Sequence, residues 1–131
     1  MKIYQGFRYR PDEKTVGETG VFVKDTAGNT ARKKLRHIVK HSPDGFNWGY
    51  GGSGPSDLAL SILCDFLGNV GSKIPERCWG VDCRHNYCLA WKHHQDFKRE
   101  FVARWPQDGN WEITEVEIAN WMARRPADGG E

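Results

Sequence analysis

The alternation of apolar and polar positions in the first part of the chain predicts short β-strands. Residues 1–10 mix apolar and aromatic side chains with polar ones, as a half-buried strand does. Residues 21–23 form a second β-rich run, which the turn-like residues 25–29 close. The basic residues 32–41 predict a third strand, and the aromatic and small residues that alternate at 46–50 predict a fourth. We therefore expect a small antiparallel sheet of about four strands.

Helical periodicity then predicts a first main helix, which belongs to the core. It begins at Pro55, a favoured first helical position, with Ser53 or Gly54 as its cap. Its apolar side chains recur at helical spacing, and Gly68 ends the helix. The side chains of this apolar stripe are Leu58, Ala59, Ile62, Leu63, Phe66 and Leu67.

Two further helices complete the predicted architecture. The second main helix is expected over residues 86–104 and ends before Pro106. A shorter C-terminal helix opens at residues 114–117, which have the capping-box pattern. The fold class is therefore α+β, with a small antiparallel sheet packed by two main helices and a shorter C-terminal helix. We expect a single domain over residues 1–125 and a disordered tail over 126–131.

Composition and charge are typical of a soluble protein with a basic N-terminal part. Of the 131 residues, 38% are hydrophobic and 27% are charged. No apolar run has the length of a membrane span, and the N-terminus lacks the apolar core of a signal peptide. We therefore expect a cytoplasmic location and no membrane partner. The net charge of +2 is unevenly spread, because residues 1–44 carry ten basic and five acidic side chains.

The glycine-rich segment 45–55, Gly-Phe-Asn-Trp-Gly-Tyr-Gly-Gly-Ser-Gly-Pro, is the first candidate for a ligand site. Glycine allows close approach of the backbone, and a helix N-terminus presents unpaired N–H groups to an anion. On this interpretation the segment binds a phosphate or a nucleotide, and an aromatic ring stacks on a base. The candidate residues are Trp48, Tyr50, Gly51, Gly52, Ser53 and Gly54. The segment is neither a P-loop nor a dinucleotide fingerprint, and the alternative is a junction whose glycines and aromatic rings serve packing.

The basic run at residues 32–41 is the second candidate and would contact a partner. Clustered positive charge attracts phosphates or an acidic protein surface. The candidate residues are Arg32, Lys33, Lys34, Arg36 and Lys40. The alternative is a solvated face of a strand or helix with no partner.

The cysteines and histidines suggest a zinc site, which we do not expect to exist. The chain has four cysteines, and in the cytosol all four should stay reduced. Zinc knuckles usually have shorter spacings than the five-residue intervals between these residues. On the expected second helix, Cys88 and His93 would also point in different directions around the helix axis. The candidate ligands are Cys78, Cys83, Cys88 and His93, with His85 and His94 as alternatives, whereas Cys64 lies apart from them. We therefore predict no metal and no cofactor.

No motif defines a catalytic site. Nucleophiles, histidines and carboxylates are present, but neither a nucleophile elbow nor a paired-carboxylate motif places them together. His94 lies on an apolar helix face and is interpreted as a core histidine. Asp57 is interpreted as a carboxylate that favours the helix N-terminus. An enzyme is therefore expected less than a binding protein.

Residues 41–60, His-Ser-Pro-Asp-Gly-Phe-Asn-Trp-Gly-Tyr-Gly-Gly-Ser-Gly-Pro-Ser-Asp-Leu-Ala-Leu, resemble the central signature of a family known only as a domain of unknown function. Two later pieces resemble the C-terminal half of that family: residues 95–98, and Trp111, Ile118 and Trp121. The resemblance covers residues 1–125, although residues 76–88 match no part of it. Members are short proteins of bacteria, archaea, phages and plasmids. The resemblance therefore implies a small α+β domain associated with mobile elements, with no assigned reaction.

We expect a small non-enzymatic binding protein of a mobile genetic element that inhibits a host defence system. It would act in an anti-CRISPR-like manner or sequester a nucleotide signal, by binding nucleic acid, a nucleotide or a host defence protein. The alternatives are a small enzyme acting on a nucleotide-like substrate and a structural zinc-binding interaction module. A pocket with a close Cys–His or carboxylate constellation would favour the enzyme. A basic or aromatic surface without one would favour the binding protein.

Overall fold

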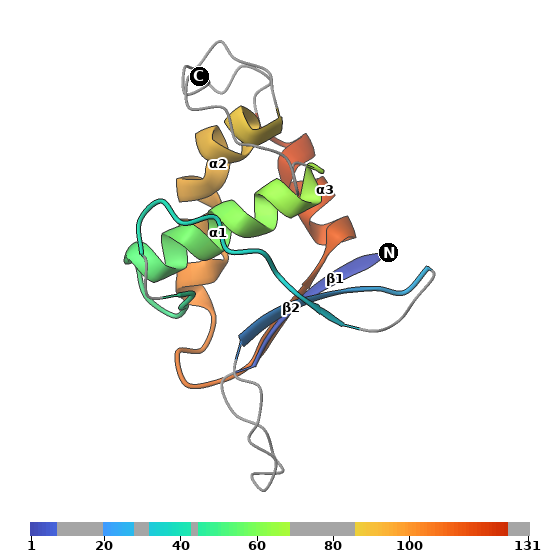
Figure 1. The fold of residues 1–131 in the computed structure, drawn as a ribbon. Coiled ribbons are helices and arrows are strands. Elements are labelled where there is room, and N and C mark those ends of the chain that lie inside the picture. Colours follow the sequence, from blue (N-terminus) through green and yellow to red (C-terminus); the bar gives the residue numbers. More distant parts are fainter. Residues whose placement is uncertain (8–19, 28–31, 43–44, 69–85, 126–131) are drawn as a thin grey trace, which may run out of the picture.

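The computed structural model describes residues 1–7, 20–27, 32–42, 45–68 and 86–125. Within these ranges the chain forms strands β1 to β3, helices α1 and α2, the short 3₁₀ helix η1, strand β4 and helix α3, in that order. Figure 1 shows α1 crossing α2, with the sheet beside the helices. The predicted α+β class is confirmed, because four antiparallel strands pack with two main helices and a shorter C-terminal helix.

The sheet has the strand order β3-β2-β1-β4 and is antiparallel throughout. The central strand β1 (Lys2–Phe7) pairs with β2 (Gly20–Asp25) on one side and with β4 (Trp111–Thr114) on the other. The two-residue strand β3 (Lys33–Lys34) pairs with β2 and forms the edge of the sheet. Tyr4, at the centre of β1, is fully buried. Strands therefore form at two of the predicted segments, and at a short part of the third.

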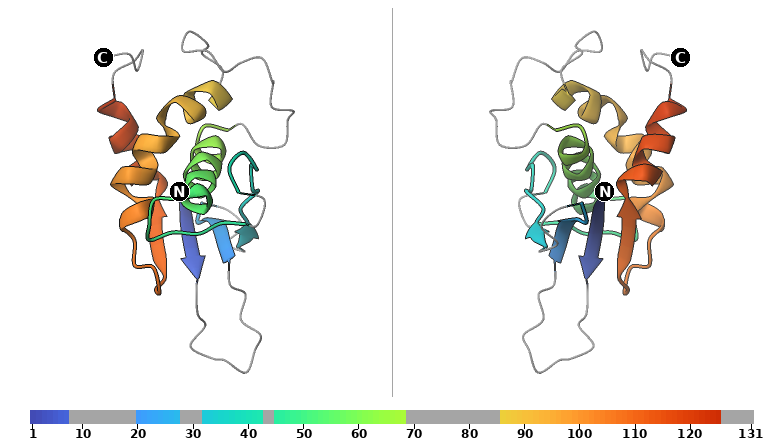
Figure 2. Two further views of the ribbon diagram at one scale, coloured as in Figure 1. Left: turned by 90° about the vertical axis from the view of Figure 1, so that its left-hand side faces the viewer. Right: turned by 90° about the vertical axis from the view of Figure 1, so that its right-hand side faces the viewer.

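The third strand is shorter than the basic run that predicted it. Pairing extends only to Leu35, whose N–H donates to the Val21 carbonyl at 3.0 Å. Beyond this point the chain turns to α1, where side chains of that helix bind the backbone of residues 37–42. Figure 2 shows this segment beside α1. The hydrogen bonds to α1 thus replace those of a longer edge strand.

The prediction of a fourth strand at residues 46–50 is wrong. Gly49 has a φ of +88°, outside the β region, and its N–H donates to the Val102 carbonyl at 3.0 Å. The aromatic alternation there serves packing, since Trp48 is buried and its indole N–H donates to the Gly109 carbonyl at 3.0 Å. The fourth strand is β4, which the sequence pattern did not single out.

Helix α1 (Ser53–Phe66) is buried on all sides along most of its length. It begins two residues before the predicted Pro55, because Gly52 is the N-cap and its carbonyl accepts the Ser56 N–H at 3.0 Å. Gly68, with a φ of +86°, follows the helix as predicted and allows the chain to leave it. The sequence predicted a single apolar stripe, whereas neighbouring segments also cover the polar side of this helix.

The C-terminal half contains two predicted helices and one break. Helix α2 (Asn86–Glu100) ends earlier than expected, because Phe101 adopts φ −123° and ψ −64° and the chain continues as η1 (Val102–Arg104). Helix α3 (Glu115–Ala123) has the predicted capping box, in which Thr114 and Glu117 bind each other's backbone N–H groups.

One hydrophobic core joins the sheet to the helices. Its largest fully buried side chains include Trp48, Trp121, Tyr4, Phe97 and Leu58. No helix in the described ranges is both long and apolar enough to cross a membrane. The predicted disordered tail lies outside the described residues.

Candidate functional site

Three polar residues line one face of the buried helix α1. Asp57, Ser61 and Asp65 are four residues apart, so successive side chains lie on the same side of the helix. All three are buried. Asp65 accepts hydrogen bonds from the Tyr4 hydroxyl at 2.7 Å and the Lys2 ammonium at 3.0 Å. Each of the three therefore fastens another segment of the chain to α1.

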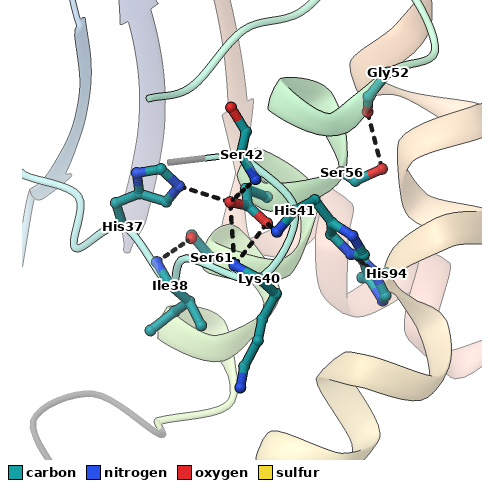
Figure 3. Close-up of polar contacts among 10 residues, drawn as sticks. His37, Ile38, Lys40, His41, Ser42, Gly52, Ser56, Ser61 and His94 are labelled. Atoms are coloured by element: carbon teal, nitrogen blue, oxygen red, sulfur yellow. Dashed lines mark hydrogen bonds and ion pairs between the residues drawn. The ribbon is translucent and has the colours of Figure 1, made fainter. Parts of the chain in front are cut away.

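Asp57 fixes the path of residues 37–42, which we call the anchored loop. Figure 3 shows the dashed contacts of His37, Lys40, His41 and Ser42 meeting at one carboxylate. Its fully buried carboxylate accepts the backbone N–H groups of His41 at 2.8 Å and Ser42 at 3.0 Å. The N–H of Lys40 is shared between both carboxylate oxygens, at 3.2 and 3.3 Å. His37 donates from Nε2 to the same carboxylate at 2.8 Å. Convergent N–H donors stabilise a buried carboxylate, and these contacts hold the backbone of the loop beside α1.

Asp57 has a different role from the predicted one. Because α1 begins at Ser53, its first turn contains no acidic residue, and Asp57 lies one turn further along. The negative charge of Asp57 is stabilised by N–H donors of the anchored loop. Ser61 adds a further contact, in which its hydroxyl oxygen accepts the Ile38 N–H at 2.8 Å.

A second polar cluster joins the anchored loop to α2. The Nε2 atoms of His41 and His94 are 3.1 Å apart, and we call these two residues the imidazole pair. His94 Nδ1 lies 2.6 Å from the Trp91 carbonyl. Because a carbonyl oxygen only accepts, Nδ1 carries the proton, and Nε2 of a neutral His94 has a lone pair. The Gln95 amide nitrogen also lies 3.2 Å from that Nε2 atom.

His94 is buried, as the sequence predicted for a core histidine. Burial lowers its pKa to about 4, and the nearby His41 and Lys98 act in the same direction. At neutral pH the His94 imidazole is therefore uncharged. The His41 ring is only partly buried and stacks on Trp91, with ring centroids 5.7 Å apart and planes inclined by 13°.

The basic run presents most of its charges to solvent. Arg32, Lys33, Lys34 and Arg36 are exposed, whereas Lys40 is partly buried. The intervening Leu35 and Ile38 are buried in the core, so the segment has one apolar and one charged side. Lys33, Lys34 and Arg36 form no ion pair with any residue that the structure describes. The Arg32 guanidinium lies 4.9 Å from the Phe7 ring centroid.

The glycine-rich segment does not bring its six candidate residues to one surface. Trp48 is 2% exposed and belongs to the core. Gly54 is buried, where a Cβ would lie 2.8 Å from Asn47 Cβ. Tyr50 is 40% exposed, and Gly51 and Ser53 are also exposed, while Gly52 is the helix N-cap. Of the two candidate aromatic rings, only that of Tyr50 is therefore exposed enough to stack on a base.

A model of a family of unknown function, DUF6166, matches residues 4–74 and 81–124. The chain belongs to this family. No curated protein and no solved structure matches the chain. The family model leaves out residues 75–80 and covers residues 81–88. The sequence resemblance, in contrast, had left residues 76–88 unmatched.

The zinc ligands considered for this DUF6166 domain are only partly described. Cys78, Cys83 and His85 lie outside the described residues, and so does the side chain of Cys88. His93 and His94 have different surroundings: His93 meets the Trp121 ring edge-on at 6.4 Å, and His94 joins the imidazole pair. No three His, Cys, Asp or Glu side chains in the described part of the chain are grouped for a metal ion.

The DUF6166 fold also reveals residues that the sequence did not single out as a site. The anchored loop and the imidazole pair depend on His37 and His41, which lie far along the chain from their partners. One local signal was available, namely the four-residue spacing of Asp57, Ser61 and Asp65 on an otherwise apolar helix. Cys64 is unsuited to nucleophilic chemistry, because burial raises the pKa of its thiol to about 12.

Proposed function

We propose that this DUF6166 protein is a non-enzymatic binding protein whose basic run contacts the phosphate backbone of a nucleic acid. The observation that carries the proposal is the row of exposed cations at Arg32, Lys33, Lys34 and Arg36. Three of them have no ion-pair partner in the described part of the chain. Such charges are available to replace the counterions of a phosphate backbone.

The way the basic run is held supports this proposal. Strand β3 fixes its first half, and the buried Asp57 carboxylate fixes the anchored loop that follows. Leu35 and Ile38 insert into the core between the charges. The backbone is therefore ordered before a partner arrives, which reduces the entropy cost of binding.

A competing explanation of the lysines comes from their place in the sheet. β3 is an edge strand, and charged side chains on an edge prevent pairing with another chain. This explanation accounts for Lys33 and Lys34. It does not account for Arg36, which lies beyond the strand and is also exposed.

The described residues favour binding over catalysis. The Asp57 carboxylate is buried and its oxygens already accept several N–H donors, so it is poorly suited to act on a substrate. The high pKa of Cys64 keeps its thiol protonated. An origin in a mobile element, an action against a host defence system and a cytoplasmic location stay proposals supported by the sequence resemblance and composition. A nucleotide or a host protein in place of a nucleic acid is likewise a proposal.

The test is a charge reversal on the basic run, measured by fluorescence anisotropy with labelled DNA and RNA over a range of salt concentrations. We expect wild-type affinity to fall linearly with log salt. In the Lys33→Glu/Lys34→Glu variant the slope should be reduced by about two, because two phosphate contacts are lost. The matched control is Arg104→Glu/Arg124→Glu, which changes the net charge equally at exposed positions of η1 and the α3 C-cap.

Two outcomes would contradict the proposal. One is the absence of salt-dependent binding by the wild-type protein at low salt. The other is an equal loss of affinity in the control variant, which would assign the effect to net charge alone. Circular dichroism of both variants checks that each remains folded.

A further inference from the structure

The imidazole pair and Gln95 bring three polar side-chain atoms close together, and the tautomer of His41 decides whether its Nε2 donates or offers a lone pair. Neutral His94 has one lone pair, on Nε2, because Nδ1 donates to the Trp91 carbonyl. Two nitrogens lie close to this single lone pair, His41 Nε2 at 3.1 Å and Gln95 Nε2 at 3.2 Å. Three polar atoms thus converge on a point where one hydrogen bond can form well.

The same geometry suits two ligands of one metal ion. Imidazole nitrogens bind a tetrahedral zinc ion at about 2.0–2.1 Å, which places two such nitrogens about 3.3 Å apart. The Nε2 atoms of His41 and His94 are 3.1 Å apart. His94 also has the arrangement typical of metal-binding histidines, in which the other ring nitrogen donates to a backbone carbonyl.

Gln95 supplies a third ligand from the same turn of α2. Rotation of its amide by 180° exchanges Nε2 for Oε1, so that a carbonyl oxygen takes the position 3.2 Å from His94 Nε2. The rotated amide nitrogen would then face Ser56, whose hydroxyl oxygen lies 3.5 Å from the present Oε1 position and can accept a hydrogen bond. The ligand set therefore needs only a side-chain rotation.

We propose that His41 Nε2, His94 Nε2 and Gln95 Oε1 bind one divalent transition-metal ion of the zinc class. Imidazole ligands favour Zn²⁺ and its neighbours over Mg²⁺ or Ca²⁺. The described residues group no third His, Cys, Asp or Glu side chain with these ligands. His41 is partly exposed, so this ligand is accessible from solvent.

This site differs from the cysteine-based zinc set considered from the sequence, since it uses His41 and no thiolate. Its three ligands are also distinct from the four exposed cations that we propose to contact a nucleic acid. The buried Asp57 carboxylate positions His41 through the His41 N–H, and α2 positions His94 and Gln95. The metal therefore joins two segments that are already held in place.

The experiment is a titration of the full chain with Co²⁺, a spectroscopic substitute for Zn²⁺, under reducing conditions. We expect one ion per chain and a visible d–d spectrum without a thiolate-to-cobalt charge-transfer band. His41→Ala and His94→Ala should each weaken binding by at least about tenfold. His37→Gln is the matched control, because it removes an imidazole from the same loop, leaves an amide to bind Asp57, and should bind Co²⁺ like the wild type.

A second measurement needs no variant and covers the case in which one fails to fold. Addition of Zn²⁺ to the wild-type protein should shift the imidazole nitrogen signals of His41 and His94 in NMR spectra and leave those of His37 in place. The proposal is overturned by the absence of saturable binding. It is equally overturned by a charge-transfer band that persists in His41→Ala, which would assign the ion to cysteines.

Discussion

At the scale of single residues, Asp57 joins parts of the chain that local sequence does not connect. Its carboxylate accepts hydrogen bonds from four residues of the anchored loop: His37, Lys40, His41 and Ser42. The side chain is fully buried, so water cannot replace these partners. A buried group of this kind is costly to alter, because the donors facing it lose their acceptor.

We predict that Asp57→Asn lowers the free energy of unfolding by about 2–4 kcal/mol, since the amide NH₂ would face N–H donors in a buried site. Urea denaturation followed by circular dichroism measures the change. The control is Asp108→Asn, at an exposed position, which should have little effect. Equal stability of the two variants would show that other contacts hold the anchored loop.

At the scale of elements, the junction before α1 depends on specific glycines. Gly49 has a φ of +88°, and a Cβ there would lie 2.4 Å from Gln107 Cα. Gly51 is exposed, and a Cβ there would meet nothing within 4 Å. The two positions are two residues apart, but only Gly49 packs against the turn that follows η1.

We predict that Gly49→Ala lowers the free energy of unfolding by about 2–4 kcal/mol, because both the backbone conformation and the contact with Gln107 oppose a side chain. Gly51→Ala should change it by less than about 1 kcal/mol, since Ala also restricts the unfolded chain. Thermal and urea denaturation of the two variants test this. A large loss in Gly51→Ala, or none in Gly49→Ala, would contradict the described path of the segment.

At the scale of the whole molecule, buried histidines tie the stability of the fold to pH. Burial lowers the pKa of His94 to about 4, and it also lowers the pKa of His93. For His94, the charges of His41 and Lys98 add to this effect, while Asp57 and the Trp91 carbonyl oppose it. In the unfolded chain a histidine titrates near its ordinary pKa of about 6.5.

We therefore predict that the protein loses stability as the pH falls from about 6.5 to about 4, because only the unfolded chain then binds a proton at His94. The stabilisation is fully present above pH 6.5, and the loss reaches roughly 3 kcal/mol by about pH 4. Urea denaturation at several pH values measures the loss. In His94→Gln the dependence over this interval should be shallower, and an unchanged dependence would contradict the assignment.

The sequence by itself determined the fold class and the elements whose signals are local. Periodic apolar positions located α1, a capping box located the start of α3, and Gly68 marked the end of α1. The charged residue types of the basic run also indicated that its side chains face solvent, as Arg32, Lys33, Lys34 and Arg36 do. These features depend on residues within one or two turns of each other, so a linear pattern is enough to find them.

The tertiary structure decided the features that depend on distant partners. β4 is only four residues long, and its pairing partner β1 lies at the other end of the chain. Asp57 binds a loop 15 to 20 residues earlier, and His41 meets His94 53 residues later. Periodicity predicted one apolar stripe on α1, whereas the burial of Asp57, Ser61 and Asp65 and the partners that satisfy them depend on the segments that the fold brings beside the helix. The anchored loop and the imidazole pair therefore emerged only in three dimensions.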